Sequence, residues 1–297
     1  MKFWSWKMTS LNKGTKFGRT YRLSIDLGEG EPIIVQSPLT LQFTVQRRQL
    51  ASLNQCQIDL FNLSKHTRDL IFQEFYGTDR VKKITLEAGY DTLSVLYSGE
   101  IFEAYNHREG TDVITSIFSQ SGNWSVDNTN VWTTINKGET VGSVLRFLSG
   151  QFTDLETGAI GAYDDVLDHP VVLNGNVWDL FKTYSNNECF IDNGKIYALK
   201  INEVIEGEIP AINKNTGILS TPRRDGGFLR VTTLFEPRLI IGQECSLESQ
   251  IEPIYNGKYK VVGLQHMGTI SGAVAGQCQT VVDLFVSNQT FKVVLDG

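Results

Sequence analysis

Cysteine and long apolar runs are scarce in this sequence, and each scarcity excludes a class of protein. The 297 residues include four cysteines, Cys56, Cys189, Cys245 and Cys278, and no two have the CxxC spacing of metal or redox sites. We therefore expect buried free thiols rather than a disulfide framework. No stretch approaches the roughly 18 apolar residues of a membrane-spanning helix, and the N-terminus lacks the apolar core of a signal peptide. These absences predict a protein folded in a cytoplasm, without integral membrane association.

Motifs of common catalytic and cofactor sites are also missing. The sequence contains no GxxxxGK[ST] or GxGxxG phosphate loop, no GxSxG elbow and no HExxH among its histidines, His66, His107, His169 and His266. We therefore expect no metal and no cofactor, and His266, at the end of a strand pattern, is typical of a structural histidine. The net charge of −6 argues against a nucleic-acid binder that works through a basic surface.

The densest acidic group is the run YDDVLDHP, in which Asp164, Asp165 and Asp168 precede His169. Paired carboxylates can act as acid and base in glycoside hydrolysis or hold calcium. Such a run before a proline is also typical of a solvated loop, and sequence proximity gives no separation between the carboxyl groups. One alternative is therefore a β-rich enzyme that degrades cell walls or polysaccharides.

A second alternative is a carbohydrate-binding protein. Trp124, Trp132 and Trp178 would form its stacking platform. Trp178 fits better beside the apolar face of a helix, whereas the other two lie in a polar stretch.

Strand patterns dominate residues 1–125. The run LQFTVQ alternates strictly, which places Leu41, Phe43 and Val45 on one face of a half-buried antiparallel strand. Several further runs rich in β-branched and aromatic residues follow it. Several strands with one short helix predict a small barrel or sandwich.

The short helix is predicted over residues 64–76, directly after a strand. Ser64 is the expected N-cap, because its hydroxyl can accept a bond from a free backbone N–H of the first turn. Asn62 is an expected turn residue and Gly77 the expected stop. Ser64 lacks the flanking glycines of a nucleophile elbow, which favours architecture over catalysis.

Residues 126–215 change in character. Apolar residues at helical spacing predict helices over 138–152, ending near Gly150, and over 174–185, with an asparagine as cap. These helices and a hairpin predict a small central α/β module.

Two Asn-Gly dipeptides predict tight hairpins. Pairing outward from the dipeptide at 193–194 sets Ile191 opposite Ile196. The second dipeptide, at 256–257, lies in the third region, residues 216–297, which reads again as antiparallel strands. The predicted fold is mainly β with an α/β insertion (α+β), in which two small antiparallel β-barrel domains at 1–125 and 216–297 flank the module at 126–215.

Several stretches also carry a family resemblance. They are IIVQSPLTLQFTVQRR at 33–48, NQCQIDLFNLSKHTRDLI at 54–71, ITLEAGYDTLSVLYSGEI at 84–101, GETVGSVLRFL at 138–148, NVWDLFKTYSNNECFIDNGKIYALK at 176–200, TLFEPRLIIGQECSLES at 233–249 and GKYKVVGLQHMGT at 257–269. In order and spacing they resemble the two barrels and the central insertion of tailed-phage baseplate hub proteins (the late control protein D type). They are also similar to the barrels of type VI secretion spike hubs.

The resemblance implies a non-enzymatic structural virion protein of the tail baseplate, assembled in the host bacterial cytoplasm. Three chains would form a homotrimeric ring with six barrel positions, which adapts the six-fold tail tube to the three-fold central spike. The implied partners are the tail tube protein, the central spike protein and other baseplate proteins, with genomic DNA only in transit through the channel.

Assembly would need contact residues, and each candidate has solvent exposure as its alternative. The candidate contacts to subunits or partners are Arg47, Arg48, Arg223, Arg224, Trp4 and Trp6. The two tryptophans could form a docking arm, although a first strand closing a barrel explains them equally well.

Overall fold

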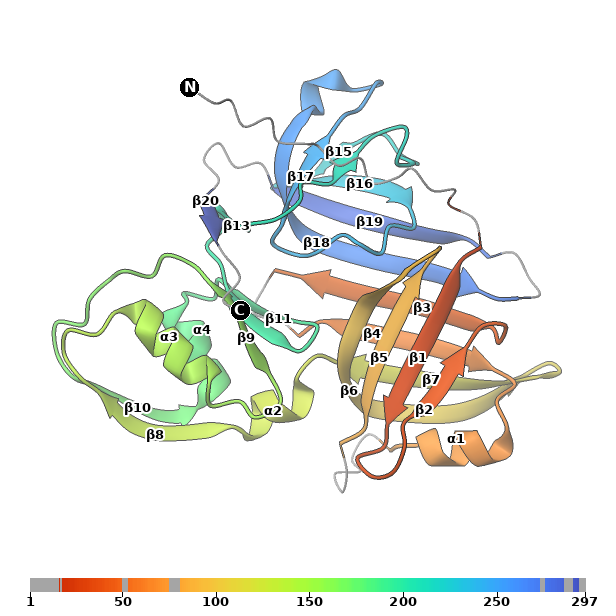
Figure 1. Ribbon diagram of the computed structural model, residues 1–297, viewed down its shortest axis with the longest axis horizontal. Helices are drawn as coiled ribbons and strands as arrows, with labels where there is room; N and C mark the ends of the chain where they lie inside the picture. The colour runs from red at the N-terminus through yellow and green to blue at the C-terminus, as the bar shows by residue number, and fades with distance from the viewer. Residues whose placement is uncertain are drawn as a thin grey trace.

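The computed structural model describes residues 16, 18–49, 53–74, 81–272, 276–285 and 291–293. Its strands fall into a first β half, a central module and a second β half (Figure 1). The first half contains β1 (Thr20–Asp26), β2 (Ile33–Gln36), β3 (Leu41–Arg48), β4 (Gln55–Phe61), α1 (Lys65–Ile71), β5 (Lys83–Gly89), β6 (Leu93–Glu109) and β7 (Asp112–Gln120).

The remaining elements follow in chain order. The central module contains α2 (Asn123–Asn128), β8 (Asn130–Ile135), α3 (Val141–Ser149), β9 (Glu156–Ile160), β10 (Val171–Asn176), α4 (Val177–Tyr184), β11 (Cys189–Asp192), β12 (Lys195–Ala198) and β13 (Glu203–Ile205). The second half contains β14 (Ala211–Ile212), β15 (Arg223–Asp225), β16 (Phe228–Leu234), β17 (Glu244–Leu247), the 3-10 helix Pro253–Tyr255, β18 (Gly257–Ile270) and β19 (Cys278–Phe285), and β20 (Phe291–Val293) pairs with β13.

Both β halves belong to one 13-stranded sheet. Its main path runs in the order β15-β16-β19-β18-β3-β4-β7-β6-β5-β1-β2. This architecture confirms the predicted mainly β, α+β fold. The pairing of the described strands is an open path rather than two separately closed barrels, because strand β18 of the second half pairs with β3 of the first.

The two halves share topology and register. In each half a long strand pairs with a short preceding strand on one edge and with the following strand on the other. Glu100 of β6 lies opposite both Lys83 and Gln120, as Lys260 of β18 lies opposite both Glu244 and Phe285.

A register shift falls at the same point of each long strand. It lies between Ile101 and Glu103 in β6, and between Val261 and Gly263 in β18. The hairpin β3–β4 corresponds to β15–β16, so the chain contains one β arrangement twice. β-bulges occupy defined positions in a sheet. Because the two bulges fall at corresponding positions, the two halves can be aligned residue by residue.

Alternation of burial follows the sequence pattern in β3. Leu41, Phe43 and Val45 are buried while Gln42 and Gln46 are exposed. Three clusters of buried side chains result: one beneath each β half, and one between α3, α4 and the strands of the central module. The cluster of the second half also includes Phe190 and Leu199 from the central module.

Three predicted helices are confirmed. Helix α3 ends at its C-cap Gly150, and α4 starts from Asn176, whose side chain accepts the N–H of Asp179. The Ser64 hydroxyl caps α1 by accepting the Thr67 N–H at 3.1 Å. Helix α1 ends at Ile71 rather than at 76, and Gly77 lies outside the described residues.

Only one of the two predicted Asn-Gly hairpins forms. Asn193 and Gly194 both adopt positive φ, and Ile191 pairs with Ile196 as predicted. The prediction at 256–257 is wrong: Asn256 has an extended conformation, with φ −70° and ψ 133°. Strands β17 and β18 pair instead across a longer connection that contains the 3-10 helix Pro253–Tyr255.

The four cysteines are free and buried, as predicted. Burial raises the pKa of the Cys189 thiol to about 11. Within the described part of the chain, no helix is long and apolar enough to cross a membrane.

Candidate assembly surface and the junctions that position it

A buried ion pair joins the central module to the sheet. The Arg47 guanidinium donates to both carboxylate oxygens of Asp192, with the Nε–Oδ1 distance at 2.8 Å. Their side chains are 1% and 4% exposed. Because β3 alternates, Arg47 points inward like Val45, and the hairpin β11–β12 brings Asp192 to meet it.

Neutral hydrogen bonds complete this junction. The Asn54 amide donates to Asp192 Oδ1 at 3.0 Å and to the Ile191 carbonyl at 2.8 Å. Two further side chains donate to carbonyls of the segment after β12. Gln49 donates to Leu199 and Lys260 donates to Lys200. Burial lowers the pKa of Lys260 to about 7. A buried charge is stable only when it is paired and hydrogen-bonded. The Arg47–Asp192 pair and the hydrogen bonds around it therefore favour one orientation of the central module on the sheet.

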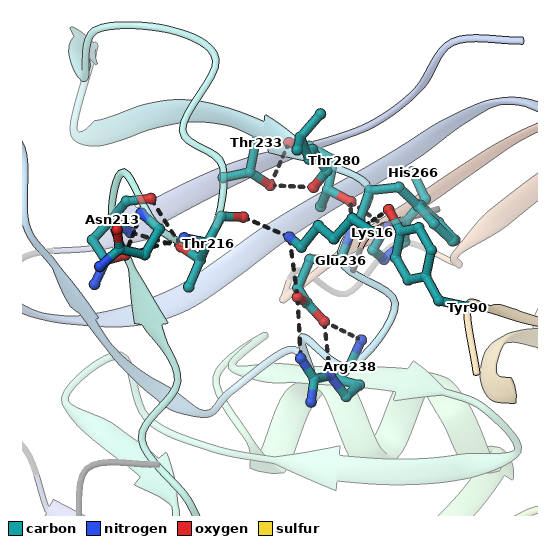
Figure 2. A network of polar contacts seen from close by, with 12 residues as sticks. Lys16, Tyr90, Asn213, Thr216, Thr233, Glu236, Arg238, His266 and Thr280 are labelled. Carbon is teal, nitrogen blue, oxygen red and sulfur yellow. Dashed lines mark hydrogen bonds and ion pairs between the residues drawn. The ribbon is translucent and has the colours of Figure 1, made fainter. Parts of the chain in front are cut away.

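A second polar network lies where the two β halves meet (Figure 2). His266 Nδ1 lies 2.9 Å from the Thr280 hydroxyl, which accepts the backbone N–H of Glu236. Tyr90, from the loop after β5, donates to the Phe235 carbonyl at 3.0 Å. The first half therefore contacts the second through side chains as well as through the β3–β18 ladder.

Residues before β1 also contact the second β half. Lys16 Nζ lies 3.5 Å from Glu236 and donates to the Thr216 carbonyl (Figure 2). Burial lowers the pKa of Lys16, although the Glu236 carboxylate opposes that effect. Arg19 donates to the Gly276 carbonyl. The chain thus crosses the second half before it enters the first.

The predicted contact arginines separate into two groups. Arg47 is buried within the chain, so the prediction of a partner contact there is corrected: its partner is Asp192. Arg48 is exposed at the end of β3, and its backbone N–H donates to Asn54. Arg223 and Arg224 are exposed on β15, which among the described strands pairs with β16 alone and forms one end of the sheet path. Trp4 and Trp6 lie outside the described residues.

The residues of the two alternative functions are not gathered into a site. Asp164, Asp165 and Asp168 are exposed in a loop, where Asp168 contacts its neighbour His169. The described residues contain no group of three His, Cys, Asp or Glu side chains that could hold a metal ion.

The three tryptophans do not form one platform. Trp132 is 85% and Trp124 45% exposed, on β8 and α2. Trp178 is buried and stacks on Phe181 with ring centroids 6.0 Å apart.

Sequence patterns missed the far end of β6. Residues Tyr105–Glu109 are exposed and pair with β7 on one edge. On the other edge, β5 pairs only as far as Glu100. Local periodicity contains no signal for this free edge, because it depends on where the neighbouring strand stops.

The sequence profile of the family described as Baseplate hub gp41 matches residues 21–267. The chain belongs to this baseplate hub family. The match spans the first β half, the central module and the second half as far as β18, and it ends before β19. The hub is a structural protein of the phage tail baseplate, as its resemblance predicted.

Several solved structures with a similar fold are tail or secretion proteins. The hub is similar to the 43 kDa tail protein of prophage MuSo2 from Shewanella oneidensis, with TM-score 0.60 and 7% identity over 89% of this chain and 96% of that one. It is also similar to a tail protein from Neisseria meningitidis MC58, with TM-score 0.56 and 10% identity over 90% and 96% of the two chains.

A third similar structure is the E. coli c3393 protein, a component of the type VI secretion system. Its TM-score is 0.51, with 8% identity over 86% of this chain and 76% of that one. At these identities the likeness shows the fold alone. No curated protein matches the hub in sequence.

Proposed function

We propose that three copies of this hub protein form a closed ring in the baseplate that adapts the six-fold tail tube to the three-fold central spike. The observation that carries the proposal is the repeated β arrangement with matching register in one chain. Three chains with two equivalent halves present six similar positions around one axis, and they still form a three-fold object.

The partners of such a ring are the tail tube protein on one side, and the central spike protein and other baseplate proteins on the other. Assembly takes place in the host bacterial cytoplasm, and genomic DNA passes through the channel without being bound. The net charge of −6 supports passage, because like charge discourages adhesion of DNA.

We also propose that the chain is divided into regions 1–125, 126–215 and 216–297. Each region contributes most of the residues of one of the three buried clusters, which supports this division. The shared cluster beneath the second half supports a central module that is fixed in place. The role of Arg48, Arg223 and Arg224 as subunit contacts is likewise a proposal, supported by their exposure.

Solution mass tests the ring. Light scattering over a range of protein concentrations is expected to approach three times the 33.3 kDa of one chain, and negative-stain images are expected to show rings of three. A chain that stays monomeric at the highest concentration, and also in the presence of tube and spike proteins, would contradict the proposal.

A further inference from the structure

The pairing of β3 with β18 inside the chain shows how a strand of one β half joins the sheet of the other half. On one edge, β18 pairs with β17 through Gly257–Lys260 and then with β3 through Gly263–Ile270. The opposite edge of β18 is occupied by β19. Strand β18 extends beyond its short neighbour β17, and the part of its edge beyond β17 pairs with a strand from the other half.

Strand β6 has an equivalent end, and no strand of the described part of the chain pairs with this edge there. Its edge beyond Glu100 contacts Lys82 and then Gln73, which exchanges both backbone bonds with Ala104 at 2.9 Å. Backbone groups alternate between edges along an antiparallel strand, so the N–H and C=O of Asn106 point to the same edge as those of Ala104. The side chains from Tyr105 to Glu109 are exposed.

Strand β15 is the counterpart of the strand that fills this place. Thr44 of β3 lies opposite Gln57, as Arg223 of β15 lies opposite Arg230. Strand β3 uses its other edge to pair with β18. The equivalent edge of β15 carries no strand among the described residues.

We infer that β15 of one hub chain pairs antiparallel with the free end of β6 in the next chain. The register follows from the internal junction, where Met267 lies opposite Thr44. Its counterpart places His107 opposite Arg223 and Asn106 opposite Arg224. This inference rests on the proposed homotrimer, since it specifies how successive chains in the ring join.

The lengths of the two hairpins fit this arrangement. Strand β3 continues to Arg48 and pairs Arg47 with Leu264, whereas β15 ends at Asp225 before a Gly-Gly turn. The counterpart of Leu264 is Ala104, whose edge Gln73 already occupies. The shorter strand stops where the bridge to Gln73 begins.

Each chain then pairs its β15 with β6 of one neighbour, and its β6 with β15 of the other neighbour. Such a head-to-tail contact forms a ring when the rotation between successive chains adds up to a full turn. Unpaired strand edges are templates for such pairing. Arg223 and Arg224 thereby gain a role in the contact between copies.

Cysteine pairs test the register directly. His107→Cys combined with Arg223→Cys places two thiols at a non-hydrogen-bonded position, where Cα atoms lie about 4.5 Å apart and within disulfide range. The native cysteines are buried, so background cross-linking is low. We expect covalent dimers and trimers on non-reducing gels after mild oxidation.

The matched control is His107→Cys with Arg224→Cys, whose side chains point to opposite faces of the sheet. This pair is expected to cross-link at least tenfold more slowly. Rings of three in which the control pair cross-links as fast as the test pair, or in which neither does, would overturn the strand pairing and leave the homotrimer intact. A chain that forms no trimer would overturn both.

Asn106→Pro is an independent variant. Proline removes the N–H that faces the free edge, and β7 pairs with the opposite edge of β6. Asn106→Pro also removes Asn106 Oδ1, which accepts the Thr115 hydroxyl at 2.8 Å, so Asn106→Ala, which keeps the backbone N–H, is its matched control. We expect about tenfold weaker trimer formation in the proline variant than in the alanine variant, because only proline removes the backbone hydrogen bond. A folded variant that forms trimers as strongly as the parent would contradict the pairing.

Discussion

His266 shows how a single buried residue couples the hub to pH. Its ring is fully buried, packs edge-on against Phe235 at 6.0 Å, and contacts the Thr280 hydroxyl through Nδ1. Nε2 has no hydrogen-bond partner among the described residues. Burial, reinforced by the charge of Arg47, lowers the pKa of His266 to about 3.

The hub is therefore expected to lose stability as pH falls below about 6.5, the ordinary histidine pKa. Between that value and the folded pKa of about 3, the unfolded chain binds a proton that the folded chain excludes. The free energy of unfolding then falls by about 1.4 kcal/mol per pH unit from this group. Urea unfolding of the parent and of His266→Gln at pH 7 and pH 5 should differ by about 2 kcal/mol in their pH-dependent loss. Parallel losses in parent and variant would contradict this prediction, and exposed His66→Gln is the control.

At the scale of elements, the two Asn-Gly dipeptides form a natural comparison. Gly194 has φ 76° and an added Cβ would meet nothing within 4 Å, so its requirement is conformational alone. Gly257 lies at the start of β18, where a Cβ would make an ordinary contact with Tyr259 at 3.7 Å.

Gly194→Ala is expected to lower the free energy of unfolding by about 1–2 kcal/mol, because a Cβ opposes the left-handed conformation. Gly257→Ala is expected to change it by less than about 0.5 kcal/mol. Chemical denaturation of both variants measures the difference. Equal effects would show that the 193–194 turn does not depend on its glycine.

Elements with a local cause were predictable from sequence. The periodicity of α3 and the Asn176 cap of α4 specify both helices, and alternation specifies β3. Helix α2 was missed because its N-cap, Gly122, offers no side-chain bond. The Trp124 N–H is instead accepted by Glu100 of β6, and such a tertiary contact leaves no local pattern.

The candidate contacts show the same limit. Arg47 continues the inward face of β3, and that alternation was the available signal for its burial. Its partner Asp192 lies in a hairpin of the central module, which no local pattern connects to β3. The free end of β6 likewise depends on non-local strand pairing.

At the scale of the whole molecule, the junctions are expected to make one cooperative unit of the three regions. The β3–β18 ladder joins the halves, and the Arg47–Asp192 pair with Asn54 joins the central module to them. Regions joined through buried, hydrogen-bonded charges unfold together when unfolding one of them leaves a buried charge of the other without its partner.

Asp192→Ala is expected to break that coupling. Removing one member of a buried ion pair costs about 3–5 kcal/mol, and it leaves Arg47 without its carboxylate. Tryptophan fluorescence, in a Trp4→Phe and Trp6→Phe background, reports on Trp124, Trp132 and Trp178, whereas far-UV circular dichroism reports mainly on the sheet. In the parent, at concentrations where the chain is monomeric, the two urea midpoints should coincide. In Asp192→Ala both should fall and separate, with the fluorescence midpoint first.

Asp69→Ala is the control: it removes the exposed pair with Lys65, whose side chains are 58% and 79% exposed. It should leave both midpoints in place because surface pairs contribute little. Coincident midpoints in Asp192→Ala would show that the ladder and the remaining hydrogen bonds couple the regions without the buried charge.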